Sequence, residues 1–561
     1  MIRYICKYTP VELFAGFGEE AVLYNPMPDN LDAADELIHR NMCSFSRALL
    51  AGRVNDDADT LVLTDCCDSI RRSWDVLRSL GQKTVMLALP RKQDECGILL
   101  YKNELIRFVR EREKQAGKTF DCSAFRSAFH QTESTGVPYV AVMGARMGDG
   151  LLNEICKISP LPVRNNTCTA PRCLGAPPDC KFEEFMEWYA GELLAQPACM
   201  RMSDLTSRRS LIEDPNLKGV IYNTVKFCDF YGFEYAALRD VLPVNMLKIE
   251  TDYTSQGASQ MLTRLQAFFE GMGAPARVNH TSVHYAGKEF FAGIDSGSTT
   301  TNAVILNEDQ SIVSSCTLPT GVQVAESARL ALDEALAKAG LDRHQIRRTV
   351  TTGYGRTGIN FRERDVTEIT CHAKGAYFLN PGVRTIIDIG GQDSKVIRID
   401  EKGAVRDFVM NDKCAAGTGR FLEMMAQSLG LSMDEMGERG LSSRENITIS
   451  SMCSVFAQSE VVSLIAAGCH LEDIVRGLNR SVAAKIMVLV GRKGLERECM
   501  MTGGVAKNPG VVAAFEERLG GKVLVPEEPE LCGALGAALI AIEEAMEYSS
   551  PVGERKDREE Y

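Results

Sequence analysis

The sequence has 561 residues, more than one hydrophobic core usually supports, so we expect two or three domains. Its 45% hydrophobic and 25% charged content is ordinary for a globular protein. A net charge of −12 argues against nucleic acid or an anionic membrane as the main partner. No apolar run is long enough to cross a bilayer, and the first residues lack the apolar segment of a signal peptide. We therefore expect a cytoplasmic protein.

Cysteine is the residue type that stands out. There are 19 cysteines, twelve between Cys6 and Cys228 and seven between Cys316 and Cys532. In a long chain without secretory signals, cysteines indicate metal or redox ligands before disulfides. The alternative, for any one cysteine taken at random, is a small buried hydrophobic residue. The sequence context of each cysteine must therefore separate ligands from packing residues.

Residues 1–272 form the first predicted domain, in which strands alternate with helices. We expect strands at 20–24, 60–64, 83–88, 138–143, 218–222 and 245–249, and helices that include Leu31–Leu50 and Lys181–Leu194. This alternation predicts an α/β architecture with a doubly wound parallel sheet. Ligands in such folds bind at the carboxyl ends of strands. Cys66 and Cys67 follow the strand at 60–64, and Cys228 follows the strand at 218–222, so these cysteines fall where a site is expected.

The stretch 273–289 lacks any periodicity and is the predicted linker. A second domain is predicted over 290–547, and the charged tail 548–561 is expected to be disordered. The second domain opens with a strand, a tight turn and another strand between Phe291 and Leu306. Asp295 ends the first of these strands. The hydroxyl and N–H groups that follow Asp295 can hold phosphates, while its carboxylate can hold Mg²⁺ through water.

Two further glycine turns follow in this domain. The first is Asp388–Asp393, where glycine removes the Cβ that would keep the backbone N–H groups away from a phosphate. The second is Gly503-Gly504, which suits an adenosine pocket. Three unrelated glycine turns are the alternative, and their order and spacing make it the weaker one. We assign catalytic roles to Asp295, Gln392 and Asp393, and nucleotide contacts to Ser296, Gly297, Ser298, Thr299, Thr300, Gly390, Gly391, Lys395, Gly503, Gly504 and Lys507.

Two cysteines of this domain lie just ahead of predicted helices. Cys414 precedes the helix Arg420–Leu429, and Cys453 precedes the helix Ser454–Ala467. Helix N-termini stabilise a thiolate through their N–H groups and the helix dipole. Since Cys414 closely follows the second glycine turn, we expect nucleotide state and a thiolate-bound centre to be coupled.

Other residues of the second domain are assigned to packing. Phe456, Val461, Leu464 and Ile465 are expected to form the buried face of the helix after Cys453, and His372 to be structural rather than catalytic. The remaining cysteines are interpreted as packing residues: Cys316, Cys371, Cys469, Cys499 and Cys532.

The three turns, in this order, resemble those of the actin, Hsp70 and hexokinase superfamily of ATPases. Four segments resemble the activators of 2-hydroxyacyl-CoA dehydratases and the ATPase subunits of benzoyl-CoA reductase, namely Gly353–Arg356, Glu368–Gly375, Asn411–Glu423 and Ser450–Glu460. The resemblance, which covers about 291–545, implies a homodimer that hydrolyses ATP with Mg²⁺. It also implies an interface 4Fe-4S cluster ligated by Cys414 and Cys453 of each chain. Two thiolates per chain, doubled by two-fold symmetry, supply the four that such a cluster needs.

The first domain resembles the cluster-carrying subunits of the same dehydratases and the related double-cubane cluster proteins. The matching segments are Tyr8–Leu13, Asn41–Phe45, Thr64–Arg72, Lys226–Asp229 and Glu250–Phe268. By position, Cys43, Cys67 and Cys228 correspond to three cluster thiolates, which would leave one iron open. The alternative for Cys43 is a core cysteine on the helix Leu31–Leu50. The resemblance leaves open whether further cysteines are ligands, namely Cys66, Cys168, Cys173 and Cys180.

The favoured interpretation is an ATP-driven electron-transfer activator fused to a dehydratase-like iron–sulfur domain. The family implies a ferredoxin or flavodoxin-type electron donor and a dehydratase or double-cubane-type acceptor. A small-molecule kinase is an alternative, because the ATPase fold is shared. A second alternative makes the N-terminal half a non-catalytic docking module.

Overall fold

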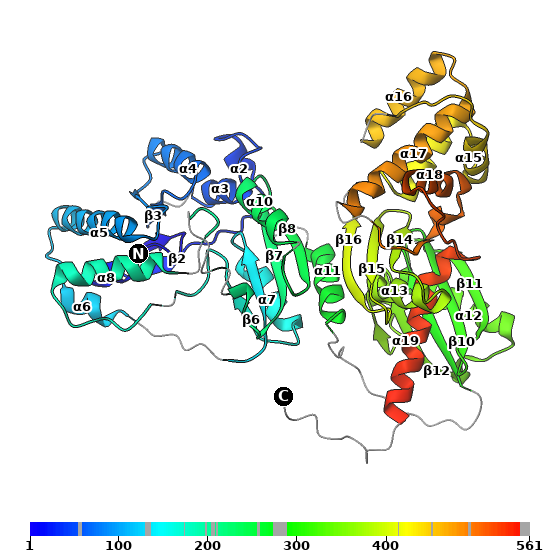
Figure 1. Cartoon of the computed structure of the whole chain (residues 1–561), viewed down its shortest axis with the longest axis horizontal. Helices are drawn as coiled ribbons and strands as arrows, with labels where there is room; N and C mark the ends of the chain where they lie inside the picture. The colour runs from blue at the N-terminus through cyan, green and yellow to red at the C-terminus, as the bar shows by residue number, and fades with distance from the viewer. Residues whose placement is uncertain are drawn as a thin grey trace. The chain divides into compact units, whose positions relative to one another are not determined.

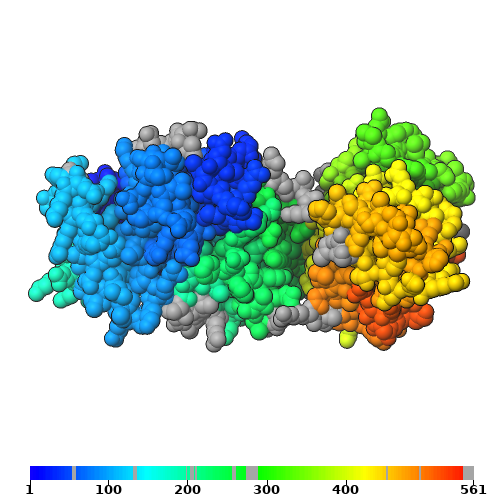
Figure 2. All heavy atoms as spheres, turned by 90° about the horizontal axis from the view of Figure 1, so that it is seen from above, coloured from blue at the N-terminus to red at the C-terminus, as the bar shows by residue number. Residues whose placement is uncertain are grey.

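The structure, a computed structural model, describes residues 1–53, 59–129, 136–172, 174–196, 199–202, 208, 211–239, 241–254, 258–272, 289–412, 414–449, 453–491 and 495–549. The chain divides into two units, Met1–Leu265 and Gln266–Tyr561 (Figures 1 and 2). Nearly all of the predicted linker and tail lie outside the described residues. Among the helices that are described, none combines the length and the apolar character needed to span a bilayer.

The N-terminal unit contains two four-stranded parallel sheets, with strand orders β2-β1-β3-β4 and β6-β5-β7-β8. The strands are β1 (Ile2–Tyr4), β2 (Ala21–Leu23), β3 (Thr60–Thr64), β4 (Thr84–Leu87), β5 (Tyr139–Gly144), β6 (Val163–Asn165), β7 (Leu217–Val225) and β8 (Met246–Thr251). The predicted parallel α/β architecture is confirmed, although it is built as two sheets. The strands β1 and β6 escaped prediction because each is three residues long with an arginine at its centre, whereas the equally short β2 is wholly apolar.

The helices of this unit are α1 (Glu12–Ala15), α2 (Asp32–Asp35), α3 (Ser44–Ala51), α4 (Asp68–Ser79), α5 (Glu95–Ala116), α6 (Cys122–Ser127), α7 (Asp149–Ile158), α8 (Phe182–Leu194) and α10 (Asp229–Leu238). Helix α11 (Ala258–Glu270) begins in this unit, and its residues from Gln266 onward belong to the C-terminal unit. The predicted helix Lys181–Leu194 is confirmed as α8.

The predicted helix Leu31–Leu50 is wrong, because the chain breaks between α2 and α3. The N–H of Ser44 donates to the carbonyl of Lys226 at 3.1 Å, a tertiary bond that replaces the helical one. Arg47 pairs with Asp35 across the break. The break makes Cys43 the N-cap of α3 instead of a residue inside a helix.

Arg146 joins the carboxyl ends of the two sheets. It follows β5, and its guanidinium donates to the carbonyls of Ile5 and Tyr24, both at 3.1 Å, at the ends of β1 and β2. It also donates to the hydroxyl of Tyr253 at 3.1 Å and lies over the ring of Phe45, 3.5 Å from its centroid. This buried side chain holds together the two strand edges at which α/β proteins bind ligands.

The C-terminal unit repeats one strand pattern. In each sheet three antiparallel strands form a meander, and a fourth strand then pairs parallel to the first of them. The sheet orders are β11-β10-β9-β12-β13 and β16-β15-β14-β17. The strands are β9 (Phe290–Ser296), β10 (Thr300–Asn307), β11 (Ile312–Pro319), β12 (Ile346–Thr352), β13 (Arg364–Asp365), β14 (Thr385–Ile389), β15 (Ser394–Ile399), β16 (Val405–Asn411) and β17 (Cys499–Thr502). This duplicated arrangement confirms the predicted actin, Hsp70 and hexokinase-type ATPase fold.

The helices of this unit are α12 (Val324–Ala339), α13 (Glu368–Leu379), α14 (Gly419–Leu429), α15 (Met433–Arg439), α16 (Ser454–Ala466), α17 (Leu471–Val490), α18 (Pro509–Leu519) and α19 (Cys532–Ser549). Helix α19 lies directly on β9, since a Cβ on Gly293 would stand 2.0 Å from the carbonyl oxygen of Ala534. The close packing fixes the end of β9, where Asp295 lies.

Candidate functional site

A cavity of about 340 Å³ in the C-terminal unit is lined by all three predicted turns. The predicted residues that line it are Asp295, Gly297, Ser298, Thr299, Thr300, Gly390, Gly391, Asp393, Lys395, Gly503, Gly504 and Lys507. The first two turns face each other closely. A Cβ on Gly391 would lie 2.0 Å from the hydroxyl oxygen of Thr299, so only glycine allows this approach.

Two predicted residues lie outside the lining of this cavity. Ser296 is fully buried, and its hydroxyl is 3.2 Å from that of Thr301. Gln392 is exposed at the outer side of its turn. The structure thus brings together the glycines, hydroxyls and aspartates of the turns but neither of these two side chains.

Lys395 is buried among carboxylates at the floor of the cavity. Its Nζ lies 2.7 Å from Asp393, 3.2 Å from Asp388 and 3.4 Å from Glu368. Burial raises the pKa of Glu368 to about 8 and also raises the pKa of Asp295. Burial would raise the pKa of Asp388 too, but His372 and Lys395 lower it. With Glu368 protonated at neutral pH, the three aspartates Asp295, Asp388 and Asp393 still outnumber the one ammonium of Lys395, and this excess of negative charge suits a hard divalent cation.

His372 lies between the two turn aspartates. Its Nδ1 is 3.2 Å from the hydroxyl of Thr502 and 3.5 Å from Asp388, and its Nε2 is 3.9 Å from Asp295. His372 and Glu368 both line the cavity, although neither was assigned to the site. Their spacing of four residues puts them on one face of α13, a helical signal that could have paired them from the sequence. The other lining residues that were not predicted include Asn302, Tyr354, Glu423, Asn508 and Glu530.

The second turn is hydrogen-bonded to the helix that follows Cys414. The N–H groups of Gly419 and Arg420, which begin α14, donate to the carbonyls of Gly390 and Gly391, each at 2.8 Å. At the other end of this loop, the side chain of Asn411 donates to the carbonyl of Cys414 at 2.9 Å. The half-buried Cys414 therefore lies on a loop anchored to a phosphate-binding turn on one side and to β16 on the other.

Cys453 is exposed and is the N-cap of α16. The predicted buried face of this helix is wrong in part. Val461 is buried and Leu464 packs against the core, but the exposed fractions of Phe456 and Ile465 are 67% and 46%. The buried face runs through Ala457 and Val461, which leaves the other side of the helix free of contacts with this core. The exposed apolar side chains of α16 are Val455, Phe456, Val462 and Ile465.

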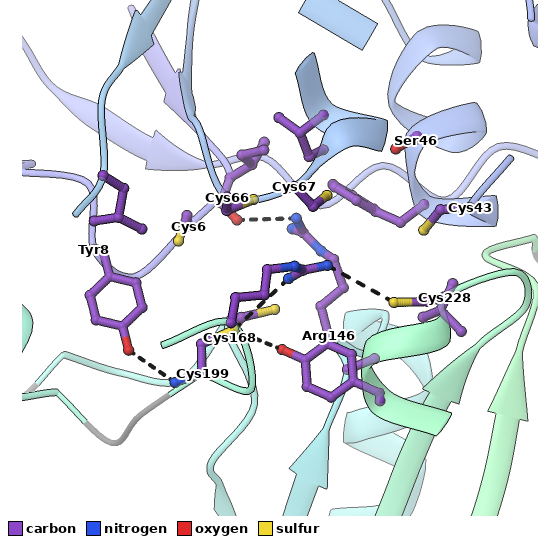
Figure 3. A pocket seen from close by; sticks show the side chains of 18 of the residues that line it. Cys6, Tyr8, Cys43, Ser46, Cys66, Cys67, Arg146, Cys168, Cys199 and Cys228 are labelled. Carbon is purple, nitrogen blue, oxygen red and sulfur yellow. Dashed lines mark hydrogen bonds between the residues drawn. The ribbon is translucent and has the colours of Figure 1, made fainter. Parts of the chain in front are cut away.

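A second cavity lies in the N-terminal unit and is lined by seven cysteines (Figure 3). The three predicted ligands are all among them, and each is the N-cap of a helix: Cys43 of α3, Cys67 of α4 and Cys228 of α10. The other four are Cys6, Cys66, Cys168 and Cys199. Cys180 does not line the cavity, and Cys173 lies outside the described residues.

Strand ends explain why these thiols meet. Cys6 follows β1, Cys67 follows β3, Cys168 follows β6 and Cys228 follows β7. Because β1 and β6 were not predicted, Cys6 was missed and Cys168 was left undecided. Cys199 was also missed, and the sequence around it carries no signal that we recognise.

Hydrogen bonds favour a thiolate at two positions of this cavity. The thiol of Cys66 and helix N–H groups lower the pKa of Cys67. The thiol of Cys228 and helix N–H groups lower the pKa of Cys43. In the described part of the chain, no three His, Cys, Asp or Glu side chains are close enough to share one metal ion. A polynuclear cluster has no such requirement, since each thiolate binds its own iron.

Two family profiles match the two halves of the chain. Residues 292–541 match the profile of the BadF/BadG/BcrA/BcrD ATPase family. The chain belongs to this family. Residues 6–143 and 138–272 match the D-component of 2-hydroxyglutaryl-CoA dehydratase.

Two relatives and one solved structure are similar to the ATPase half. The activator of lactoyl-CoA dehydratase from Anaerotignum propionicum is 49% identical over 254 residues, which are 45% of this chain and 98% of the relative. The 2-hydroxyisocaproyl-CoA dehydratase activator of Clostridioides difficile is 44% identical over 260 residues, 46% of this chain and 97% of the relative. A solved structure of the Clostridium difficile activator with bound ADPNP has a TM-score of 0.45 at 44% identity, covering 46% of this chain and 96% of that one.

Proposed function

We propose that this protein is an ATP-driven reductive activator. It hydrolyses ATP in the C-terminal unit and passes electrons through a 4Fe-4S cluster to an iron–sulfur centre in the N-terminal unit. The observation that carries the proposal is the pair of 2.8 Å hydrogen bonds from the start of α14 to the carbonyls of Gly390 and Gly391. They join the nucleotide site to the loop of Cys414 without any intervening side chain.

The C-terminal cavity fits ATP and Mg²⁺. The hydroxyl and N–H groups of Ser298 and Thr299, together with Gly391, surround the place where the phosphates would lie. Asp295 and Asp388 hold the cation, and Lys395 is kept charged by its carboxylate neighbours, which raise its pKa. The adenosine lies against Gly503-Gly504, where the absence of a side chain on Gly504 leaves open space.

Two chains complete the interface cluster. Each chain presents Cys453 on an exposed surface and Cys414 on a half-buried loop. Two-fold symmetry supplies four thiolates, the number that a 4Fe-4S cluster needs. The apolar side chains of α16 become buried in the same contact, which gives the dimer a hydrophobic driving force.

Nucleotide state controls the position of Cys414. Loss of the γ-phosphate removes a ligand from the turn at Gly390 and Gly391, and the hydrogen bonds to α14 transmit the shift. A helix end that occupies one position with ATP and another with ADP is a two-state element of the kind that nucleotide switches use.

In the N-terminal unit, Cys43, Cys67 and Cys228 hold the receiving centre. The donor set fits, because three helix N-termini place their N–H groups and positive dipole ends at one cavity. When bound, such a centre would supply one-electron chemistry, and these three thiolates would hold it. The chain receives its electrons from a ferredoxin or flavodoxin-type donor, and a dehydratase or double-cubane-type protein is the final partner.

Anaerobic EPR of the full chain tests the proposal. With a reductant alone the N-terminal centre stays oxidised, and with reductant, ATP and Mg²⁺ its reduced signal appears. A signal of equal size without ATP would contradict the coupling, and a chain that binds no iron after reconstitution would contradict both clusters.

A further inference from the structure

Arg201 reaches into the N-terminal cavity and contacts thiols where an arginine would ordinarily meet carboxylates. Its Nη1 is 3.9 Å from the sulfur of Cys199, and its Nη2 is 3.9 Å from the sulfur of Cys228, two cysteines labelled in Figure 3. Its Nε is buried, and among the described residues it has no hydrogen-bond partner. Within the described ranges, no carboxylate forms an ion pair with this guanidinium.

Arg146, in the same cavity, provides an internal comparison. Its guanidinium donates to oxygens on several sides, including the carbonyls of Ile5 and Tyr24 and the hydroxyl of Tyr253. It thus has a complete structural role that needs no ligand. The donors of Arg201 have only sulfur partners, although both arginines line one cavity. The difference indicates that the guanidinium of Arg201 interacts with the group that the thiols bind.

Aromatic rings and a backbone contact keep Arg201 in place. Its guanidinium carbon lies 5.0 Å from the ring centroid of Phe230 and 5.6 Å from that of Tyr231. Its carbonyl accepts a hydrogen bond from Arg91 at 3.5 Å. Both rings belong to α10, the helix capped by Cys228. The charge is therefore fixed relative to one of the proposed cluster ligands.

A cation withdrawn from water and left without an anion is costly. An anionic group in the cavity removes this cost, and an iron–sulfur cluster with thiolate ligands is such a group. Cluster potentials depend on the net charge and on hydrogen bonds to the sulfurs. A fixed positive charge next to the sulfurs favours the reduced form, which carries one more negative charge.

We propose that Arg201 is the charge-compensating residue of the N-terminal iron–sulfur centre, and that it raises the reduction potential of this centre by its charge and by N–H contacts to the sulfurs of Cys228 and Cys199. The inference rests on the proposed function, because it requires the centre to be present. The step is a one-electron reduction in which the electron comes from the interface cluster and no bond is made or broken.

A redox titration followed by EPR tests this role. The full-length chain carries Cys414→Ser, so that all bound iron belongs to the N-terminal cavity. In this background Arg201→Gln shifts the reduction equilibrium at least tenfold toward the oxidised form, equal to about 59 mV for one electron. Arg201→Lys keeps the positive charge and shifts the reduction equilibrium less than threefold. Arg72→Gln is the control, because Arg72 is 73% exposed on α4 and does not line the cavity.

Each outcome bears on the proposal. A loaded Arg201→Gln chain with the midpoint of the Arg72→Gln control overturns it. If Arg201→Gln fails to retain iron while Arg201→Lys retains it, the charge is needed to hold the centre, which supports the same role. If both variants lose iron, the positive charge does not by itself retain the centre, and the proposal is wrong. A parent chain without N-terminal iron is a different result, because it contradicts the proposed function itself.

Discussion

The two thiol sites of this protein differ in what surrounds them. In the N-terminal unit the cysteines line an internal cavity, where Cys43 and Cys67 are buried by residues of the same chain. In the C-terminal unit Cys453 is exposed, and Phe456 beside it is 67% exposed. One chain can complete an enclosed site, whereas the exposed Cys453 and the half-buried Cys414 would be completed by a second copy in the proposed dimer. Under the proposed function, the first site would belong to the single chain and the second to the dimer.

The largest expected effect is on the dimeric site. In the proposed dimer, Cys453→Ser would remove two of the four interface thiolates at once, because symmetry repeats the change. We expect complete loss of the interface iron and a weaker dimer, measured by iron and sulfide analysis and by sedimentation. Cys499→Ser, a change at a buried cysteine of β17, should alter neither quantity. Unchanged iron in the Cys453→Ser protein would exclude Cys453 as a ligand.

The matching change in the enclosed site is Cys67→Ser. It removes one thiolate per chain, so the N-terminal iron should be lost while the dimer and the interface iron remain. Iron analysis combined with sedimentation distinguishes this from the effect of Cys453→Ser. Cys122→Ser is the control, since Cys122 is exposed and does not line the cavity. A dimer that dissociates in Cys67→Ser would show that the two sites are not independent.

Asp295→Ala separates the nucleotide site from both thiol sites. Loss of one group that positions charge in a phosphoryl-transfer site costs about 10²-fold or more in rate. Steady-state ATP hydrolysis should fall by at least that factor, and the iron content should stay at the parent level. A normal hydrolysis rate would place Asp295 outside the phosphate site.

Phe456→Asp tests the apolar surface without changing a thiol. A charge placed in a desolvated contact should weaken the dimer at least tenfold, about 1.4 kcal/mol. The dimer dissociation constant is measured by sedimentation equilibrium. Val322→Asp provides the control, because Val322 is 99% exposed. Equal dimer stability in the two variants would remove α16 from the interface.

The smallest effect concerns Glu368 and the pH dependence of stability. Its pKa of about 8 in the folded chain lies above the ordinary value of 4.5, so the folded state binds more protons between these two pH values. The free energy of unfolding should therefore fall as the pH rises through this window. Glu368→Gln removes this contribution, on the order of 2 kcal/mol, which thermal unfolding at pH 5 and pH 8 detects. Glu438→Gln, at an exposed position, should leave the pH dependence as it is, and a parent-like slope in Glu368→Gln would contradict the raised pKa.

Sequence patterns predicted some periodic elements well, although the long helix expected over Leu31–Leu50 is two separate helices. The strand at 60–64 and the helix ending at Leu194 were placed correctly, because several residues repeat the same signal. The three-residue strands β1 and β6 gave no such signal. Because Cys6 and Cys168 follow these two strands, neither was assigned to the candidate site from the sequence.

Short-range chemistry was readable from the sequence alone. The glycine turns, the aspartates that end strands, and the cysteines just ahead of helices are local patterns, because backbone approach to a phosphate and helix capping both depend on a few neighbouring residues. The order of the three turns carried the resemblance that predicted the ATPase fold. The resemblance of the first domain nominated Cys43, Cys67 and Cys228, which the structure brings to one cavity.

Tertiary structure decided what no local pattern contains. The break before α3 depends on a hydrogen bond from Ser44 to Lys226, far away in the chain, and this bond makes Cys43 a cap. The exposure of Phe456 depends on which face of α16 packs against the core. The sequence does not distinguish the two faces here, because apolar residues occur on both. Arg201 meets the sulfur of Cys228 only through folding, because Cys228 lies 27 residues further along the chain. Such features arise from contacts between distant residues, so only the folded chain defines them.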